Sequence, residues 1–179
     1  MKRLAEKNPE KLIDLLQERL AFERTGVKLY DRVLLMMRAS QEPQVLGMVD
    51  TMQAYRDEEA EHQEWLEEQI RALGGDEHGE SVRARLVATE SRGIEEVILH
   101  KDVELQHLFH ALMAAELVDN AGWDLLVALA EEADDDDALD ALSLRQAEEE
   151  DHLEYLRQTM ARYAESQVLG EQLQLPIEP

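Results

Sequence analysis

The chain has 179 residues, with 18 Lys and Arg against 41 Asp and Glu and a formal net charge of -23. This length suits one domain with a sizeable core, and the charge argues against binding to nucleic acid or an anionic membrane, because phosphate contacts need Lys and Arg. There is no cysteine, which excludes disulfides, thiolate metal sites and a cysteine nucleophile. With no apolar signal sequence and no run near 18 apolar residues, we expect a soluble, cytoplasmic protein.

The first half of the chain predicts two long helices. Asn8 and Pro9 are typical of a helix start, and the apolar periodicity continues to about Arg38. A second helix is predicted over residues 43–73, because two glycines follow it.

The second half of the chain predicts two more long helices. Residues 76–90 are polar and expected to be irregular, and a short amphipathic segment follows over 91–101. Asp102 is a plausible cap for a third helix that reaches about residue 133. A tight acidic connection over 134–137 leads to a fourth helix that ends near residue 165, before an extended tail over 166–179.

These helices predict an all-α fold. A helix of about 30 residues is about 45 Å long, which suits a four-helix bundle over residues 9–165. Short links make two antiparallel helix hairpins, and the 28 residues of 74–101 can form a long crossover connection along the bundle. The second and third helices are therefore expected to run parallel.

Each predicted helix has an apolar seam that ionisable residues interrupt at one level. Residues three apart share a helix face, so the two Glu-x-x-His motifs each place both side chains in the core. A carboxylate in a core is costly unless it is paired or bound to a metal. The residues are Glu23 on the first helix, Glu59 and His62 on the second, Glu116 on the third, and Glu149 and His152 on the fourth.

Their spacing predicts that they meet. In an antiparallel hairpin, residues equally far from the turn lie level. Glu23 and Glu59 have their midpoint at position 41, inside the first link, and Glu116 and Glu149 have theirs at 132.5, beside the second. Both pairs would lie about 24 to 27 Å from their turns. Facing hairpins would therefore form one site with four carboxylates and two imidazoles.

A third Glu-x-x-His motif, Glu104 with His107, fails this test, because it faces away from the Glu116 seam and no seam Glu lies opposite it. We expect it on the surface, as a solvated pair. The remaining histidines, His78, His100 and His110, are expected there too. For the six residues together, the alternative to a metal site is a coincidental buried polar layer, which the cost of unligated buried charge disfavours.

The ligand types indicate the ion. Carboxylate oxygens with one imidazole per metal, and no sulfur, suit iron or manganese, and zinc could also occupy the site. Glu59 and Glu149 are expected to bridge two ions about 3.5 to 4 Å apart, with Glu23 and Glu116 as terminal ligands. Such a pair of ions can share two electrons with dioxygen or peroxide.

This layout resembles the ferritin-like di-iron carboxylate superfamily, which includes bacterioferritin, rubrerythrin and manganese catalase. By this resemblance, Tyr30 corresponds to the bacterioferritin-type tyrosine that is expected to hydrogen-bond near the metals, the alternative being a core aromatic. Ala60 stands where bacterioferritin has its haem-ligating Met, so no haem is expected. Without the cysteines of rubrerythrin's iron-thiolate module, the electron donor would be external, another protein or a small molecule.

Other carboxylates should orient the imidazoles by accepting from the ring nitrogen that is not on the metal. Asp119, on the third seam, is the best candidate for this role. Glu58 and Glu148, each just before a ligand Glu, are expected to be solvated. Arg145 on the fourth seam could neutralise an extra buried carboxylate.

The leading functional hypothesis is a two-iron site that reacts with dioxygen or peroxide, as an iron oxidase or a peroxide scavenger. Two alternatives stay open. One is iron binding or storage by a homo-oligomer, and the other is an acidic helical interaction module with a vestigial site.

Overall fold

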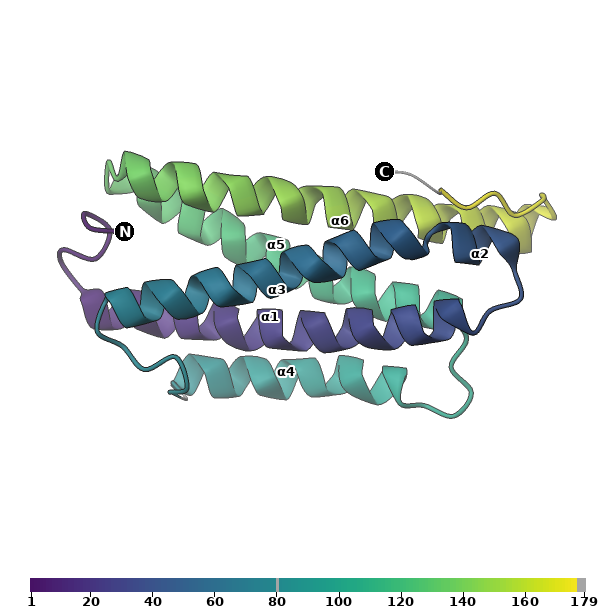
Figure 1. The fold of residues 1–179 in the computed structure, drawn as a ribbon, viewed down its shortest axis with the longest axis horizontal. Helices are drawn as coiled ribbons and strands as arrows, with labels where there is room; N and C mark the ends of the chain where they lie inside the picture. The colour runs from purple at the N-terminus through teal and green to yellow at the C-terminus, as the bar shows by residue number, and fades with distance from the viewer. Residues whose placement is uncertain (80, 177–179) are drawn as a thin grey trace.

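The computed structural model describes residues 1–79 and 81–176. Within these residues the chain is helical, with short connections (Figure 1). The helices are α1 (Pro9–Arg38), α2 (Pro43–Gly47), α3 (Val49–Ala72), α4 (Val82–Ile98), α5 (Leu105–Glu132) and α6 (Asp136–Leu169).

Four long helices form the bundle. α1 packs antiparallel to α3, and α5 packs antiparallel to α6 (Figure 1). α3 and α5 run in the same direction, and α4 lies outside them against α1 and α5. The predicted all-α bundle of two antiparallel hairpins joined by a crossover connection is confirmed.

Two apolar clusters fill the bundle on either side of its middle. One contains Leu16, Leu20 and Ile70 near the start of α1, and the other contains Leu34 and Met52 near its end. The polar positions predicted from the seams fall between the two clusters along α3, α5 and α6. Burial of the two clusters therefore holds the four helices together above and below a polar layer.

The predicted helix over residues 43–73 is divided in two. Its first turn and a half is α2, and the main helix α3 starts at Val49. The backbone N–H of Met48 bonds to Val45, three residues back, in a tighter turn than an α-helix makes. Gly47 explains the break, because glycine has the lowest helix propensity after proline.

The prediction of irregular structure over 76–90 was wrong from residue 82 onward. Ser81 caps α4 by accepting a hydrogen bond from the backbone N–H of Ala84 at 3.1 Å. The helix buries Ala84, Val87 and Ser91, a spacing of three and four residues that places them on one face. Two of these three side chains are small, which hides the periodicity in the sequence.

The boundaries of the last two helices also differ from the prediction. α5 follows Glu104 as its N-cap, not Asp102. α6 begins inside the expected acidic link, where the side chain of Asp135 accepts from Ala138 N at 3.3 Å. It continues past residue 165 to Gly170, whose φ of 70° is the left-handed conformation that ends many helices. Residues 177–179 of the predicted tail lie outside the described residues.

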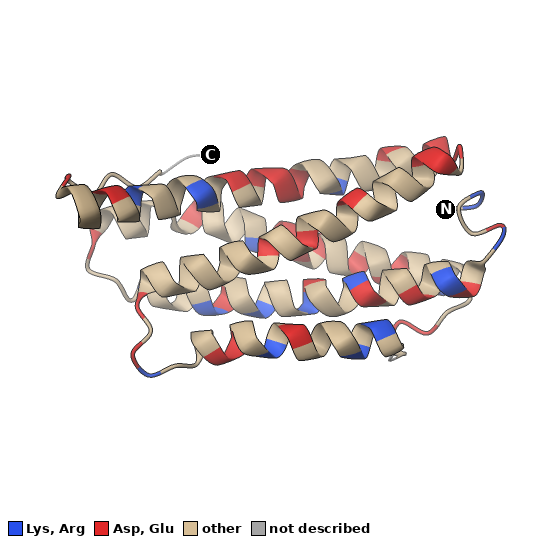
Figure 2. Ribbon diagram, turned by 180° about the vertical axis from the view of Figure 1, so that it is seen from behind, with Lys and Arg blue, Asp and Glu red and all other residues tan. Residues whose placement is uncertain are grey.

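Charge is unevenly distributed over the bundle (Figure 2). Lys and Arg occur on α1 and α4, whereas α5 carries neither. No helix in the described part of the chain is both long enough and apolar enough to cross a membrane.

Candidate metal centre

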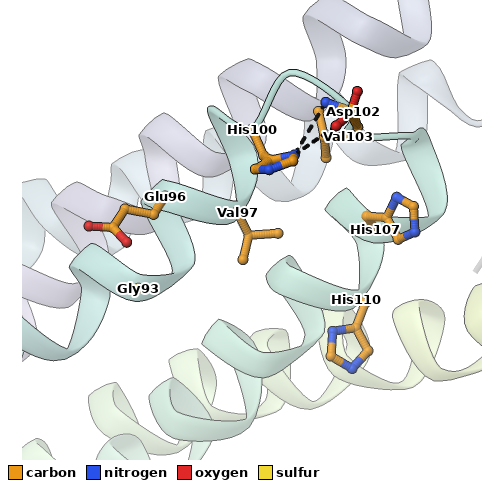
Figure 3. Close-up of a pocket in the computed structure, with 8 residues that line it drawn as sticks. All are labelled: Gly93, Glu96, Val97, His100, Asp102, Val103, His107 and His110. Carbon is orange, nitrogen blue, oxygen red and sulfur yellow. Dashed lines mark hydrogen bonds and ion pairs between the residues drawn. The ribbon is translucent and has the colours of Figure 1, made fainter.

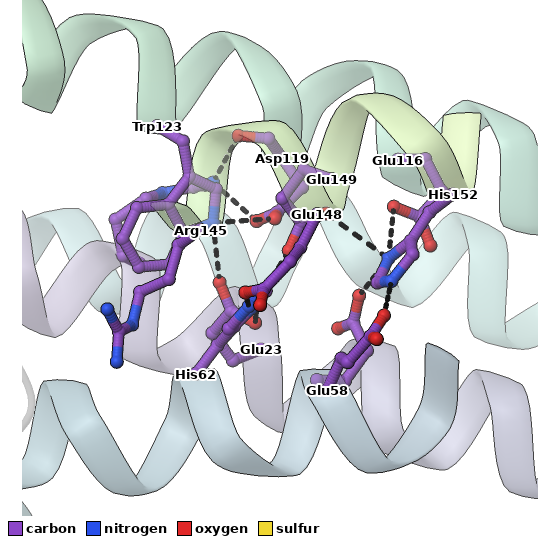
Figure 4. Close-up of polar contacts among 12 residues, drawn as sticks. Glu23, Glu58, His62, Glu116, Asp119, Trp123, Arg145, Glu148, Glu149 and His152 are labelled. Atoms are coloured by element: carbon purple, nitrogen blue, oxygen red, sulfur yellow. Dashed lines mark hydrogen bonds and ion pairs between the residues drawn. The ribbon is translucent and has the colours of Figure 1, made fainter. Parts of the chain in front are cut away.

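The structure brings all six predicted ligand residues to one place, at mid-length of the bundle (Figure 4). None of them is more than 3% exposed. α1 and α5 each contribute one Glu, and α3 and α6 each contribute a Glu-x-x-His pair. The residues are Glu23, Glu59, His62, Glu116, Glu149 and His152.

They form two overlapping groups. Oxygen and nitrogen atoms of Glu59, Glu116, Glu149 and His152 lie within 4.8 Å of one another, and so do those of Glu23, His62 and Glu149. Glu149 belongs to both groups and therefore lies between two positions that could each hold a metal ion. Glu59, the other residue predicted to bridge, belongs to the first group.

The outer nitrogen of each imidazole is held by a carboxylate from the facing hairpin. His62 Nε2 lies 2.8 Å from Glu148 Oε2, and His152 Nε2 lies 2.7 Å from Glu58 Oε2. The prediction that Glu58 and Glu148 are solvated was wrong, although each is still about one-third exposed. An Nε2–H that donates to carboxylate leaves Nδ1 free to bind a metal.

The inner nitrogens face the buried carboxylates. His62 Nδ1 lies 2.7 Å from Glu149 Oε1, and His152 Nδ1 lies 3.4 Å from Glu59 Oε1. If both Nε2 atoms carry protons in neutral rings, each Nδ1 presents a lone pair to an oxygen that is also an acceptor. Such a contact is favourable only when a proton or a metal ion lies between the two atoms.

Several atoms of this cluster lack a hydrogen-bond partner within the described part of the chain. They are Glu23 Oε2, Glu116 Oε2, Glu149 Oε2 and His152 Nδ1, all buried. Buried polar atoms are normally paired, so their concentration at one point indicates a missing partner. Oxygen with a single imidazole at each position fits iron or manganese and also admits zinc.

The pKa values of the buried groups also indicate a site for cations. Burial raises the pKa of the Glu23, Glu59 and Glu149 carboxyls well above the ordinary value of 4.5, and repulsion from neighbouring carboxylates raises it further. Burial alone lowers the pKa of His152, but the carboxylates around its ring, Glu116 foremost, outweigh this and raise it above 6.5. Without metal ions, the cluster therefore retains protons that cations would displace.

Two hydrogen-bond donors cross between the hairpins. Tyr30 donates its hydroxyl to Glu116 Oε1 at 2.6 Å, and Trp123 donates its indole N–H to Glu23 Oε1 at 3.0 Å. Tyr30 stands seven residues after Glu23, and Trp123 seven after Glu116. Each hairpin thus supplies the donor for the carboxylate of the other.

Asp119 is buried beside this cluster but has other partners than expected. Its carboxylate accepts from Arg19 Nη1 at 2.5 Å and from the Trp123 indole at 3.0 Å. The imidazoles instead donate their outer N–H groups to Glu148 and Glu58.

Arg19 was missed by the sequence analysis. Its side chain is 5% exposed and forms a buried ion pair with Asp119. Arg145, which was expected to neutralise a buried carboxylate, instead donates to Ala141 O at 2.7 Å and lies 4.1 Å over the ring of Trp65.

Two glycines leave room for these charged groups. A Cβ at Gly26 would overlap the carboxylate of Glu59, and one at Gly122 would overlap the guanidinium of Arg19. A glycine inside a long helix costs stability. A glycine inside a long helix, next to charged seam residues, therefore indicates in the sequence that a large charged side chain packs against that helix.

The other histidines lie away from the centre and are exposed, as predicted. His100, His107 and His110 line a pocket of about 540 Å³ at the connection of α4 to α5 (Figure 3). His107 Nδ1 accepts from the backbone N–H of Glu104 at 3.0 Å, so the third Glu-x-x-His motif caps a helix.

No protein-family model and no curated protein matches the sequence. A structural match does exist, to a crystal structure described as ferritin-like, diiron-carboxylate proteins from Bacillus anthracis str. Ames. It has a TM-score of 0.64 and 18% sequence identity, and it covers 89% of this chain and 99% of that one. The protein has the ferritin-like fold.

Proposed function

We propose that the protein binds two metal ions, iron or manganese, between its hairpins and uses them to react with dioxygen or peroxide. The observation that carries this proposal is the set of buried, unpartnered oxygen and nitrogen atoms at the meeting point of four helices. The diiron description of the structurally similar protein supports it. When bound, two iron ions would supply two electrons to the oxidant.

The chain's own residues would divide the work of holding the ions. Glu23 and His62 would hold one ion, and Glu116 and His152 the other, because these sets fall in different groups. Glu149, common to both groups, would bridge the two ions. Four ionised carboxylates would balance two divalent cations, so that no net charge is left in the apolar interior.

Tyr30 would hold a proton close to the reaction. Its phenol donates to Glu116 Oε1, and burial together with repulsion from that carboxylate raises the pKa of Tyr30 well above its ordinary value. The phenol therefore stays protonated at neutral pH, beside one metal position. Burial of the six ligands also excludes bulk water from both positions.

The test compares two double variants. Replacing both central carboxylates, E59A/E149A, should abolish paired metal binding and oxidant consumption, measured by plasma mass spectrometry and by stopped-flow absorbance after anaerobic Fe(II) loading. The matched control is E64A/E154A, which removes exposed carboxylates five residues further along the same helices. Two ions per chain retained in E59A/E149A would refute the site assignment.

The same experiment separates the possible activities. Faster reaction with peroxide than with dioxygen would indicate a peroxide scavenger, and the reverse an iron oxidase. Storage would require a hollow homo-oligomer, which size-exclusion chromatography detects.

A further inference from the structure

A pocket of about 430 Å³ opens between α3 and α6, on the outer side of the candidate metal centre. Four of its seven lining residues are acidic. We call it the α3–α6 pocket, and its lining residues are Asp50, Thr51, Ala54, Tyr55, Glu58, Glu148 and Asp151.

Two residues that line the pocket are hydrogen-bonded to the histidines of the centre. Glu58 and Glu148, which line it, are the carboxylates that bond His152 Nε2 and His62 Nε2. Both carboxylates are partly exposed, whereas the imidazoles behind them are at most 1% exposed. The pocket is thus separated from the two metal positions by one layer of side chains.

A buried hydroxyl without a partner also belongs to this pocket. Tyr55 is 5% exposed, and its hydroxyl lacks a hydrogen-bond partner within the described part of the chain. Its ring centroid lies 4.4 Å from that of His152. A buried phenol normally finds a partner, so this one points to a polar ligand that passes or occupies the pocket.

From these contacts we propose that the α3–α6 pocket is the route by which divalent cations reach the metal centre, with Asp50 and Asp151 attracting them at its mouth. This inference rests on the proposed function. All six ligands are buried, so a cation needs an opening, and a pocket lined by one sign of charge raises the local concentration of counter-ions. The pocket between α1 and α4, by contrast, carries Arg24 and Lys28, which repel cations.

The route has a sequence of oxygen ligands along it. A hydrated cation would first meet Asp50 and Asp151, both exposed, and then the hydroxyl of Tyr55 and the carboxylates of Glu58 and Glu148. Passage inward requires these two carboxylates to release their imidazoles for the time of transfer. Both are about one-third exposed, which gives them room to turn toward solvent.

The experiment measures the rate of metal binding, with Co(II) as the probe and its absorption in stopped flow as the signal. Ala54 is exposed at the pocket, so A54K places an ammonium at the opening without removing a ligand. A72K is the matched control, because it adds the same charge to an exposed position on the same helix, about 27 Å away by helical rise. We expect A54K to bind Co(II) on the order of tenfold more slowly than A72K, with two ions per chain at the end point.

A second pair of variants removes negative charge instead of adding positive charge. D50N/D151N should slow binding by a similar factor, whereas D134N/D140N, with the same change in net charge near the α5–α6 turn, should not. The difference should shrink at high salt, because the Debye length falls to about 3 Å at 1 M. Y55F should slow binding less, since it removes one neutral oxygen from the route.

Equal rates for both members of each pair would overturn the route, even if two ions still bind. A wild-type protein that binds no Co(II) would instead refute the proposed function, and the route with it. Circular dichroism of each variant confirms that the bundle is folded.

Discussion

Glu23 and Glu116 occupy corresponding places in the two hairpins, but their surroundings differ. Both are buried, and each accepts a hydrogen bond from an aromatic residue of the other hairpin. On the Glu116 side the donor is Tyr30, and Gly26 leaves space for the Glu59 carboxylate. The Glu23 side carries an additional buried carboxylate, Asp119.

Residues at equal offsets from Glu23 and Glu116 show which side chains make the difference. Asp119 stands three residues after Glu116, and the same offset from Glu23 gives Gly26. Arg19 stands four residues before Glu23, and the same offset from Glu116 gives Leu112. The side of the centre around Glu23 therefore has a buried ion pair between the hairpins where the side around Glu116 has a leucine and a glycine, and the two candidate metal positions are chemically unequal.

The largest effect should come from breaking this ion pair. R19M would leave Asp119 charged and unpaired next to Glu23 and Glu149, and should cost the metal-free protein about 3 to 5 kcal/mol of unfolding free energy. R19M/D119N removes both charges and should recover most of the loss. Urea denaturation measures both. If the double variant were no more stable than R19M, the unpaired charge of Asp119 would not be the cause of the lost stability.

Removing the Tyr30 hydroxyl tests the side of the centre around Glu116. Y30F keeps the ring and deletes the hydrogen bond to Glu116, and bonds to charged groups are worth about 1.5 to 3 kcal/mol. We expect the Co(II) affinity of one of the two positions to change by about tenfold or more, with the other unchanged. Calorimetric titration resolves the two steps, and equal changes in both would contradict the assignment of Tyr30 to one position.

The two glycines separate metal binding from stability. G26A should displace the Glu59 carboxylate and weaken metal binding, at a packing cost of about 1 to 3 kcal/mol. G122A should displace Arg19 and lower the stability of the metal-free protein, with a smaller effect on metal affinity. The comparison fails if G122A weakens metal binding as much as G26A does.

The smallest effect expected is the pH dependence of the metal-free protein. The Glu23, Glu59 and Glu149 carboxyls have pKa values raised above 4.5, and the His152 pKa is raised above 6.5. Each group holds its proton in the folded state at pH values where the unfolded chain has lost it. Their contribution to stability is present below the unfolded pKa and lost as pH rises through the folded pKa.

Thermal unfolding between about pH 5 and about pH 8 checks this sign. The metal-free protein should lose melting temperature as pH rises, and the gain on adding Co(II) should be larger at the higher pH, because the cation then replaces fewer protons. A metal-free protein that becomes more stable toward pH 8 would contradict the inference that these buried groups hold protons in the folded state.

The fold could be predicted because helix length, apolar seams and turn residues agree along most of the chain. The convergence of the six residues could also be predicted, because distance from a turn fixes the level of a residue in an antiparallel hairpin. The boundaries of α4 could not, since it buries small side chains such as Ala84 and Ser91, which carry little periodic signal.

The residues around the centre were harder to predict. Glu58 and Glu148 lie on the flank of their helices, and whether such a side chain turns toward a histidine or toward water depends on the distance between helices. Arg19 lies on the α1 seam facing Asp119, 100 residues away. Only Gly122, which makes space for the guanidinium, hinted at it in the sequence.

The most direct test of the proposed metal centre is anomalous X-ray diffraction from crystals of the wild-type protein loaded with Co(II) or with Fe(II) under anaerobic conditions. Two peaks per chain are expected, one beside His62 Nδ1 and one beside His152 Nδ1, with Glu149 contacting both. Peaks confined to surface carboxylates, or ligation through the Nε2 atoms, would contradict it.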